Sequence, residues 1–273
     1  MRHLVATDQG FAFLEGRTRI TSLDKNGRRL WGTDIGAAEE SPLLGLTTTG
    51  HDTLVALVGA NRLITVDPRG RTGGSISPFG VDDIDAFVPL TGNRFAAVTT
   101  DSAAPLVIFD NQGKRLSRNA FPSADFSALR PLMRQGWTAT DDRLEHWVFG
   151  FAFGDGFVVL DTSAGALTRG RFIESTNFPD VIRRTQARKT DEILGAAVQT
   201  AVSIALRDTE VVVLYAGKDR TLAKRVIDRY SIHSGKYVGS YELPWVSRWI
   251  AAKGKRLFVL HGRYISELHP STR

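Results

Sequence analysis

The carboxylates best placed to hold a cation are Asp83 and Asp85, which are separated by a single residue. On a β-strand, residues i and i+2 point to the same face, so these two side chains can share a metal ion or contact one ligand. Adjacent carboxylates, such as Asp141 and Asp142, point to opposite faces and cannot do so. We therefore expect a cation or ligand contact at Asp83 and Asp85, with strand capping as the structural alternative.

Two tryptophans bracket an arginine in the segment "LPWVSRWIAAKGKR", where Trp245 and Trp249 lie on either side of Arg248. Aromatic rings and a guanidinium group can stack on a sugar or a base. If the segment is a strand, the two rings share one face because they are four residues apart. The alternative is that both rings are wedged between neighbouring sheets as part of the core.

A third candidate is a basic cluster within residues 177–203, formed by Arg183, Arg184, Arg188 and Lys189. This segment interrupts the run of short apolar strands, and Pro179 suits the first turn of a helix. We expect a loop or helical insertion at 177–200 that presents the cations to a ligand or partner.

The sequence assigns no catalytic residue. It contains no cysteine, which excludes disulfides, thiol nucleophiles and thiolate metal sites. Six histidines are present, but none has the i, i+2 or i, i+4 spacing of a local metal pair, and the closest two, His261 and His269, are eight residues apart. Glycine-rich phosphate loops and nucleophile elbows are also absent, so we expect no cofactor.

A recurring strand–turn–strand unit must position these residues. The segments "RITSLDKNGRRLWG", "RLITVDPRGRTGG" and "PLVIFDNQGKRLS" each pair an alternating apolar strand with an Asp-x-x-Gly turn, and their aspartates, Asp24, Asp67 and Asp110, are 43 residues apart. The Asp side chain caps a β-turn and the Gly supplies the positive φ that lets the chain reverse. Looser copies are "FVVLDTSAGALT" from Phe157 and "RYSIHSGKYVGSY" from Arg229, each with one extra turn residue before its glycine.

A period of this length is typical of repeats that form one four-stranded sheet each. The sequence therefore predicts an all-β fold, a six-bladed β-propeller of four-stranded antiparallel blades, with five or seven blades as alternatives. The whole chain, residues 1–273, is expected to form one domain. The blades are expected near residues 3–32, 42–78, 83–121, 137–172, 200–243 and 246–269; the last shows three strands, and a closed ring makes it a neighbour of the first.

Charge and hydropathy limit where the protein acts. Residues 181–273 carry 17 Lys and Arg against 8 Asp and Glu, so the net charge of +6 arises from the last third. No apolar run is long enough for a transmembrane helix, and the first residues lack the pattern of a secretory signal. We expect a monomer, located in the periplasm or at the cell surface if a signal was removed upstream, and otherwise in the cytoplasm.

The segment "ANRLITVDPRG" resembles NHL-type and TolB-like six-bladed propellers, and "RVIDRYSIHSGKYVGSYELP" resembles a late blade of bacterial six-bladed β-propeller proteins of unassigned function. The resemblance implies a scaffold that binds proteins, peptides, glycans or small ligands at a channel mouth. "LDKNGRRLWGTDIG" is similar to quinoprotein-like repeats, although Trp31 has no counterpart in the other copies. The segment Glu15-Gly16-Arg17 is similar to the Glu-Gly-Pro segment of sugar-lactonase-like propellers but lacks the proline.

These observations favour a non-enzymatic binding scaffold for a protein, peptide, glycan or small-molecule ligand, and we do not expect nucleic acid to bind. The first alternative is a metal-dependent hydrolase of the lactonase or esterase kind, with carboxylates from different blades. The second alternative is a quinoprotein-like outer-membrane assembly scaffold. A propeller fold alone does not select among these functions.

Overall fold

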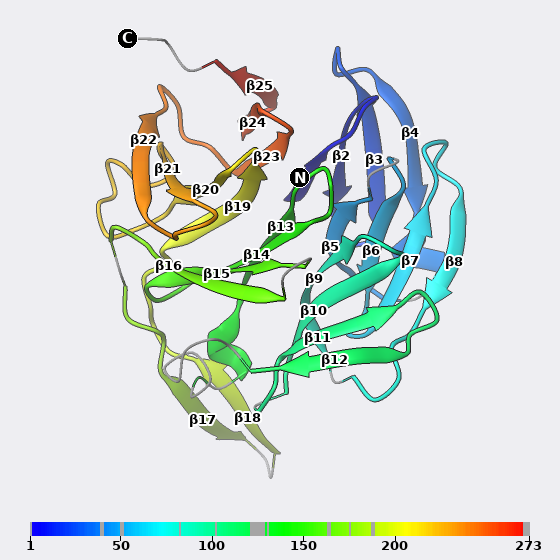
Figure 1. The fold of residues 1–273 in the computed structure, drawn as a ribbon, viewed down its shortest axis with the longest axis horizontal. Helices are drawn as coiled ribbons and strands as arrows, with labels where there is room; N and C mark the ends of the chain where they lie inside the picture. The colour runs from blue at the N-terminus through cyan, green and yellow to red at the C-terminus, as the bar shows by residue number, and fades with distance from the viewer. Residues whose placement is uncertain are drawn as a thin grey trace.

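The computed structural model describes residues 2–38, 41–49, 52–81, 83–101, 103–120, 129, 131–162, 165–174, 176–186 and 189–269. These residues form seven antiparallel sheets, of which six are arranged in a ring around a central channel (Figure 1). Within each of these six sheets the strands follow chain order, from the channel outward. The predicted six-bladed β-propeller is thus confirmed.

The first three blades have four strands each. Blade 1 comprises β1 (Arg2–Ala6), β2 (Gly10–Glu15), β3 (Arg19–Asp24) and β4 (Arg29–Asp34). Blade 2 follows the short helix α1 (Ile35–Ala38) and comprises β5 (Leu43–Thr48), β6 (Leu54–Val58), β7 (Arg62–Val66) and β8 (Thr72–Ile76). Blade 3 comprises β9 (Ile84–Leu90), β10 (Arg94–Thr99), β11 (Leu106–Asp110) and β12 (Arg115–Asn119).

The second half of the ring begins after the 3-10 helix η1 (Pro131–Arg134). Blade 4 comprises β13 (Gly136–Thr140), β14 (His146–Phe151), β15 (Gly156–Asp161) and β16 (Ala166–Arg171). Blade 5 comprises β19 (Ala201–Arg207), β20 (Glu210–Tyr215), β21 (Val226–Ser231) and β22 (Tyr237–Glu242). In the described residues blade 6 has three strands, β23 (Trp249–Lys253), β24 (Arg256–His261) and β25 (Tyr264–Leu268).

The segment between blades 4 and 5 is an additional two-stranded hairpin, β17 (Val181–Gln186) and β18 (Lys189–Leu194), rather than the loop or helix expected at 177–200. Cross-strand complementarity explains this correction. Ile182 lies opposite Ile193, and Arg183 lies opposite Glu192, so the two halves of the segment match in register. Figure 1 shows the hairpin projecting from the rim of the ring.

The turn chemistry predicted for the repeats is present at all three Asp-x-x-Gly turns. The Oδ1 atom of Asp24, Asp67 or Asp110 accepts hydrogen bonds of 2.8–2.9 Å from the backbone N–H groups two and four residues later. The turn glycines Gly27, Gly70 and Gly113 have φ values of 80–82°. These local interactions fix the hairpin that joins the third and fourth strands of each blade.

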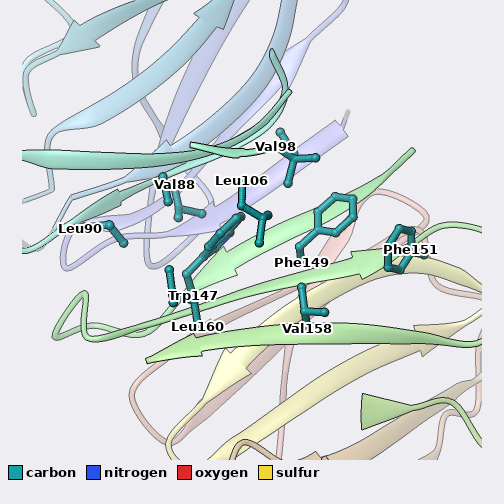
Figure 2. Close-up of a cluster of buried hydrophobic side chains, with 11 residues drawn as sticks. Val88, Leu90, Val98, Leu106, Trp147, Phe149, Phe151, Val158 and Leu160 are labelled. Atoms are coloured by element: carbon teal, nitrogen blue, oxygen red, sulfur yellow. The ribbon is translucent and has the colours of Figure 1, made fainter. Parts of the chain in front are cut away.

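The core is divided into six clusters of buried apolar side chains, one at each boundary between neighbouring blades. Figure 2 shows the cluster between blades 3 and 4, where Trp147, Phe149 and Phe151 of β14 pack against aliphatic residues of blade 3. A sixth cluster joins Phe11 and Phe13 of blade 1 to Phe258 and Leu260 of blade 6. The first and last blades are therefore neighbours, and the ring is closed by packing.

Candidate functional site

One end of the channel gathers side chains from five of the six blades. In every blade the innermost strand is the first in the chain, and all the innermost strands run in the same direction along the channel. Their first residues therefore lie at one end of the channel, which we call the proximal mouth. It is formed by residues at the first or second position of the innermost strands: His3, Leu44, Asp85, Trp137 and Trp249. The equivalent residue of blade 5, Val202, packs against the cluster between blades 5 and 6.

β-Bulges occur at four of these positions. The pairing of the first two strands in blades 1, 2, 3 and 5 shifts register at His3–Leu4, Leu44, Asp85 and Val202, respectively. His3 also has a φ of 52°, which is uncommon for a residue other than glycine. A bulge inserts an extra residue and redirects its side chain, and bulges are frequent at the rims of closed sheets and beside functional sites.

Three aromatic rings from different blades meet at the proximal mouth. The ring centroids are 5.0 Å apart for His3 and Trp249, 5.1 Å for Trp137 and Trp249, and 6.2 Å for His3 and Trp137. The Trp137 Nε1–H donates a hydrogen bond of 3.2 Å to the carbonyl of Ala201 in blade 5. This aromatic cluster joins blades 1, 4 and 6. Leu44 of blade 2 and Asp85 of blade 3 lie on the other side of the mouth.

Asp85 is the carboxylate of the mouth, and its pKa is raised to about 6. The main cause is desolvation by the surrounding protein, and the nearby charge of Asp83 adds to it. The guanidinium of Arg134, on η1, opposes the shift. Arg134 is itself buried, and its Nη1 donates a hydrogen bond of 2.5 Å to the carbonyl of Asp101.

The channel below the mouth is narrow. It encloses about 100 Å³ and is lined mainly by small and aliphatic residues, with Thr48 and Thr140 near its far end. Ligand pockets for whole drug-sized molecules are several times larger. The channel can therefore accept a single side chain or the end of a ligand, rather than a complete ligand of that size.

Asp83 and Asp85, the predicted cation ligands, both lie at the start of blade 3. Asp83 directly precedes β9, and Asp85 is its second residue. Their charges interact, and both residues are exposed, but Asp85 lines the channel whereas Asp83 does not. A metal role for these two residues stays a prediction.

The two tryptophans of the "LPWVSRW" segment are not together, so the expectation of one shared face is wrong. Residues 243–248 are a loop, because β23 begins only at Trp249. Trp249 lines the channel, whereas Trp245 stacks on His261 with the centroids 4.1 Å apart. Arg248 is exposed between them.

The basic cluster is placed on the hairpin at the rim, away from the proximal mouth. Arg183 and Arg184 are exposed on β17, and the Arg183 Nε lies 3.2 Å from a carboxylate oxygen of Glu192. Lys189 starts β18, and Arg188 lies outside the described residues. A binding role for this cluster stays a prediction.

The opposite end of the channel, the distal mouth, holds a lysine between carboxylates of other blades. The Nζ of Lys253 lies 3.2 Å from Oδ1 of Asp8 and 4.0 Å from Oδ1 of Asp52. Both carboxylate oxygens of Asp52 also accept hydrogen bonds from the backbone N–H of Asp8. Desolvation raises the pKa of Asp142 nearby, and the charge of Lys253 opposes this shift.

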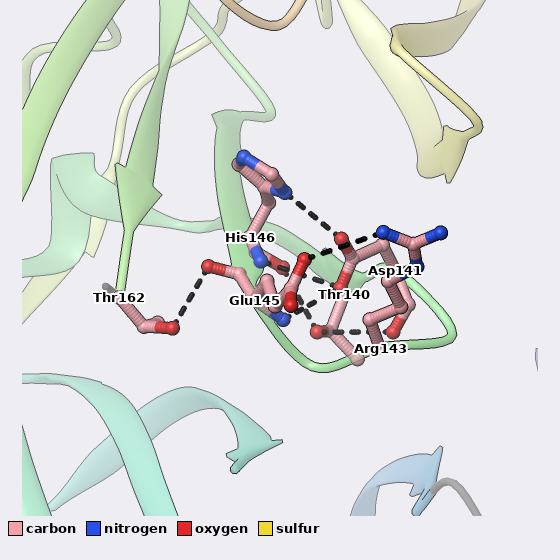
Figure 3. A network of polar contacts seen from close by, with 6 residues as sticks. All are labelled: Thr140, Asp141, Arg143, Glu145, His146 and Thr162. Carbon is pink, nitrogen blue, oxygen red and sulfur yellow. Dashed lines mark hydrogen bonds and ion pairs between the residues drawn. The ribbon is translucent and has the colours of Figure 1, made fainter. Parts of the chain in front are cut away.

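A second group on blade 4 has the composition of a metal site. Ligand atoms of Asp141, Glu145 and His146 lie within 4.8 Å of one another (Figure 3). However, the Asp141 carboxylate already accepts hydrogen bonds from the backbone of Glu145 and His146, and its Oδ2 lies 2.9 Å from His146 Nδ1. The arrangement is thus explained by the turn that joins β13 to β14.

Sequence reasoning missed His3, Leu44 and Trp137. None belongs to a local motif, and each is distinguished only by its position as the second residue of an innermost strand. Aligning the six predicted blades by their first strands would have placed these residues in register with Asp85 and Trp249. The signal is therefore positional and becomes visible only across repeats.

No family model matches the sequence, and no curated protein matches it. Solved structures do match. Virginiamycin B lyase from Staphylococcus aureus aligns with a TM-score of 0.59 at 10% identity, over 99% of this chain and 84% of that chain. A streptogramin B lyase structure gives 0.59 at 12% identity, over 99% and 83%. BamB from Moraxella catarrhalis gives 0.50 at 12% identity, also over 99% and 83%.

The chain has the fold of a six-bladed β-propeller. Identities at this level establish the fold alone, because one propeller architecture carries both lyases and proteins with other functions. The helices in the described part of this propeller are too short to cross a membrane. Its function must therefore be argued from its own mouth and surfaces.

Proposed function

We propose that this propeller is a non-enzymatic binding scaffold that receives a protruding side chain or loop of a protein or peptide partner at the proximal mouth. The observation that carries this proposal is the meeting of His3, Trp137 and Trp249 from three blades, opposite Leu44 and Asp85. Tryptophan is enriched among the residues that dominate the free energy of protein association. A narrow channel behind these rings suits the tip of a partner rather than a whole small molecule.

The exposure of Leu44 supports the same conclusion. Its side chain is 42% exposed although it opens an innermost strand, and the bulge at this position turns it toward the mouth. Exposed aliphatic groups beside aromatic rings mark contact surfaces when they are grouped. The carboxylate of Asp85 supplies one polar contact that can orient a partner, as in most recognition sites.

The hydrolase alternative is less well supported. A metal-dependent hydrolase needs about three acid, Asn or His side chains around the ion. Among the described residues that line the channel, Asp85 and His3 are the groups of this kind. The structural similarity to BamB concerns the fold, so an outer-membrane assembly role has no residue-level support. A periplasmic or cell-surface location stays a prediction.

Site-specific photocrosslinking in the source cells tests the proposal. A photoreactive amino acid at Leu44 is expected to crosslink a discrete partner, whereas the same group at Leu116, 49% exposed on the outermost strand of blade 3, is not. Trp249→Leu is expected to reduce the crosslink at least about tenfold, because loss of a central aromatic contact typically costs 2 kcal/mol or more. Circular dichroism would verify that the variant is folded.

Equal crosslinking from both positions, or an unchanged crosslink in the Trp249→Leu variant, would contradict a partner site at the proximal mouth. Hydrolysis of esters or lactones that depends on Asp85 would favour the enzymatic alternative instead.

A further inference from the structure

Three loops at blades 5 and 6 carry exposed cations; we call their surface the basic rim. The loops are the β20–β21 connection (216–225), the linker from β22 to β23 (243–248) and the β24–β25 turn (262–263). The exposed cations of the basic rim are Lys218, Arg220, Lys224, Arg225, Arg248 and Arg263.

Hydrogen bonds and ring stacking hold these loops together as one surface. The carbonyl of Lys224 accepts a hydrogen bond of 2.7 Å from Ser247 N–H, and the carbonyl of Arg225 accepts one of 2.7 Å from Leu243 N–H. Trp245 in the linker stacks on His261, which directly precedes the β24–β25 turn. The cations are therefore presented by a connected framework and not by independent loops.

Apolar side chains project between the cations. Leu222 in the first loop, Val246 in the second and Tyr264 after the third are 39%, 57% and 71% exposed. Each of these side chains lies within two residues of an arginine or lysine in its own segment. The basic rim thus combines one apolar tip with positive charge in every loop.

The charges of the basic rim are not neutralised locally. Three carboxylates lie beside these loops: Glu174 accepts a hydrogen bond from Lys218 N–H, Asp219 accepts two from Thr221, and Glu242 ends β22. Within the described part of the chain, no ion pair joins any of the six cations to a carboxylate. Six cations against three carboxylates leave an excess of positive charge.

We infer that the basic rim docks on the surface of a bilayer that contains anionic phospholipids. Basic side chains near such a surface attract the lipid phosphates, and apolar tips insert at the boundary between headgroups and acyl chains. The channel contains none of the six cations, and neither does a second cavity lined by residues of blades 2, 3 and 4, among them Thr65, Phe95 and Leu144. Neither cavity would therefore hold an acidic peptide against these cations. The linker of the rim leads directly into Trp249, so docking brings the proximal mouth close to the bilayer.

Co-sedimentation of the full chain with vesicles tests this inference. We expect binding to vesicles of phosphatidylcholine with 30% phosphatidylglycerol at low salt, none to phosphatidylcholine alone, and a steep decrease at high salt. Arg220→Glu, Lys224→Glu and Arg225→Glu combined are expected to weaken binding about 100-fold or more, since each basic residue contributes about fivefold. Leu222→Ser with Val246→Ser is expected to weaken it about tenfold.

The matched control reverses Lys25, Arg28 and Arg69 to Glu. These three cations are exposed on the β3–β4 and β7–β8 turns of blades 1 and 2, at the strand ends opposite those that carry the basic rim, and their reversal makes the same change in net charge. The control is expected to lower binding less than about threefold, and circular dichroism would show that all variants are folded.

Four results would overturn the inference. The first is no binding of the unmodified chain to anionic vesicles, and the second is an equal loss in the control variant. The third is unchanged binding after substitution of Leu222 and Val246, because the tips would then not insert. Tighter binding to poly-glutamate or duplex DNA than to vesicles at the same salt would assign the rim to another macromolecule and would also overturn it.

Discussion

At the scale of single residues, Asp85 lies in an environment that disfavours the ionised form of its carboxyl group. Its carboxylate is partly desolvated at the channel wall and is repelled by Asp83, and the charge of Arg134 compensates only in part. An amide would fit the same bulge without this penalty. A destabilising ionisable group at a channel mouth is characteristic of a functional position.

The sign of its effect on stability follows from linkage. The pKa of Asp85 is about 6 in the folded chain and near the ordinary value of 3.8 when unfolded, so between these values the native state binds more protons. Stability contributed by this group therefore rises as the pH falls from 6 to 4. Asp85→Asn is expected to stabilise the protein by about 1 kcal/mol at pH 7.5, a value discounted because the carboxylate touches channel solvent.

Thermal or urea unfolding at two pH values checks this expectation. The difference between the unmodified chain and the Asp85→Asn variant should nearly vanish at pH 4. A stability difference that is independent of pH would show that the pKa of Asp85 is not raised in the folded chain. Asp219→Asn provides a control in the opposite direction, because its hydrogen bonds with Thr221 lower the pKa of that carboxyl.

At the scale of elements, the Asp-x-x-Gly turns do more than reverse the chain. An ideal Cβ added to Gly113 would lie 2.6 Å from the carbonyl oxygen of Ser77, which follows the outermost strand of blade 2. Gly27 occupies the same turn position in blade 1, yet nothing lies within 4 Å of its ideal Cβ. The difference agrees with the three described strands of blade 6, which provide no fourth strand for the blade 1 turn to contact.

This contrast predicts unequal effects of one substitution at equivalent positions. Gly27→Ala is expected to destabilise the protein by about 1 kcal/mol, since only the positive φ opposes an alanine. Gly113→Ala is expected to cost roughly 2–4 kcal/mol, because a contact with the backbone of a neighbouring blade is added. Urea unfolding measures both, and equal losses would mean that the turn does not interlock the blades.

At the scale of the whole molecule, ring closure depends on contacts between residues far apart in sequence. Packing between blades 6 and 1 closes the core, and Lys253 joins blade 6 to Asp8 and Asp52 at the distal mouth. Asp52 is nearly buried, so loss of the lysine leaves a desolvated carboxylate without its cation.

Lys253→Met is therefore expected to destabilise the ring by about 1–2 kcal/mol and to raise the pKa of Asp142 further. Lys255→Met is the matched control, because Lys255 is 83% exposed and its contact with Asp208 is 3.9 Å long. The control should change stability by less than about 0.5 kcal/mol. Urea unfolding at neutral pH measures the stability of both variants. Similar losses of stability in the two would show that Lys253 does not contribute to ring closure.

The repeating hairpin, a count of six blades with five or seven as alternatives, and the approximate limits of each blade could be predicted from the sequence alone. These features depend on interactions within a few residues, such as the Asp24 cap, the positive φ of Gly27 and the alternation of apolar side chains. The same local logic placed Asp83 and Asp85 at the start of a strand. Local patterns of this kind can be read without knowing how the blades are arranged.

Only the tertiary structure decided which of these residues meet. His3, Asp85, Trp137 and Trp249 are brought to one mouth by closure of the ring and by bulges that insert single residues into innermost strands. The insertion became a hairpin because its two halves pair with each other, and Trp245 was separated from Trp249 by a loop. Such outcomes depend on register and on contacts between distant segments, for which short-range sequence patterns carry no signal.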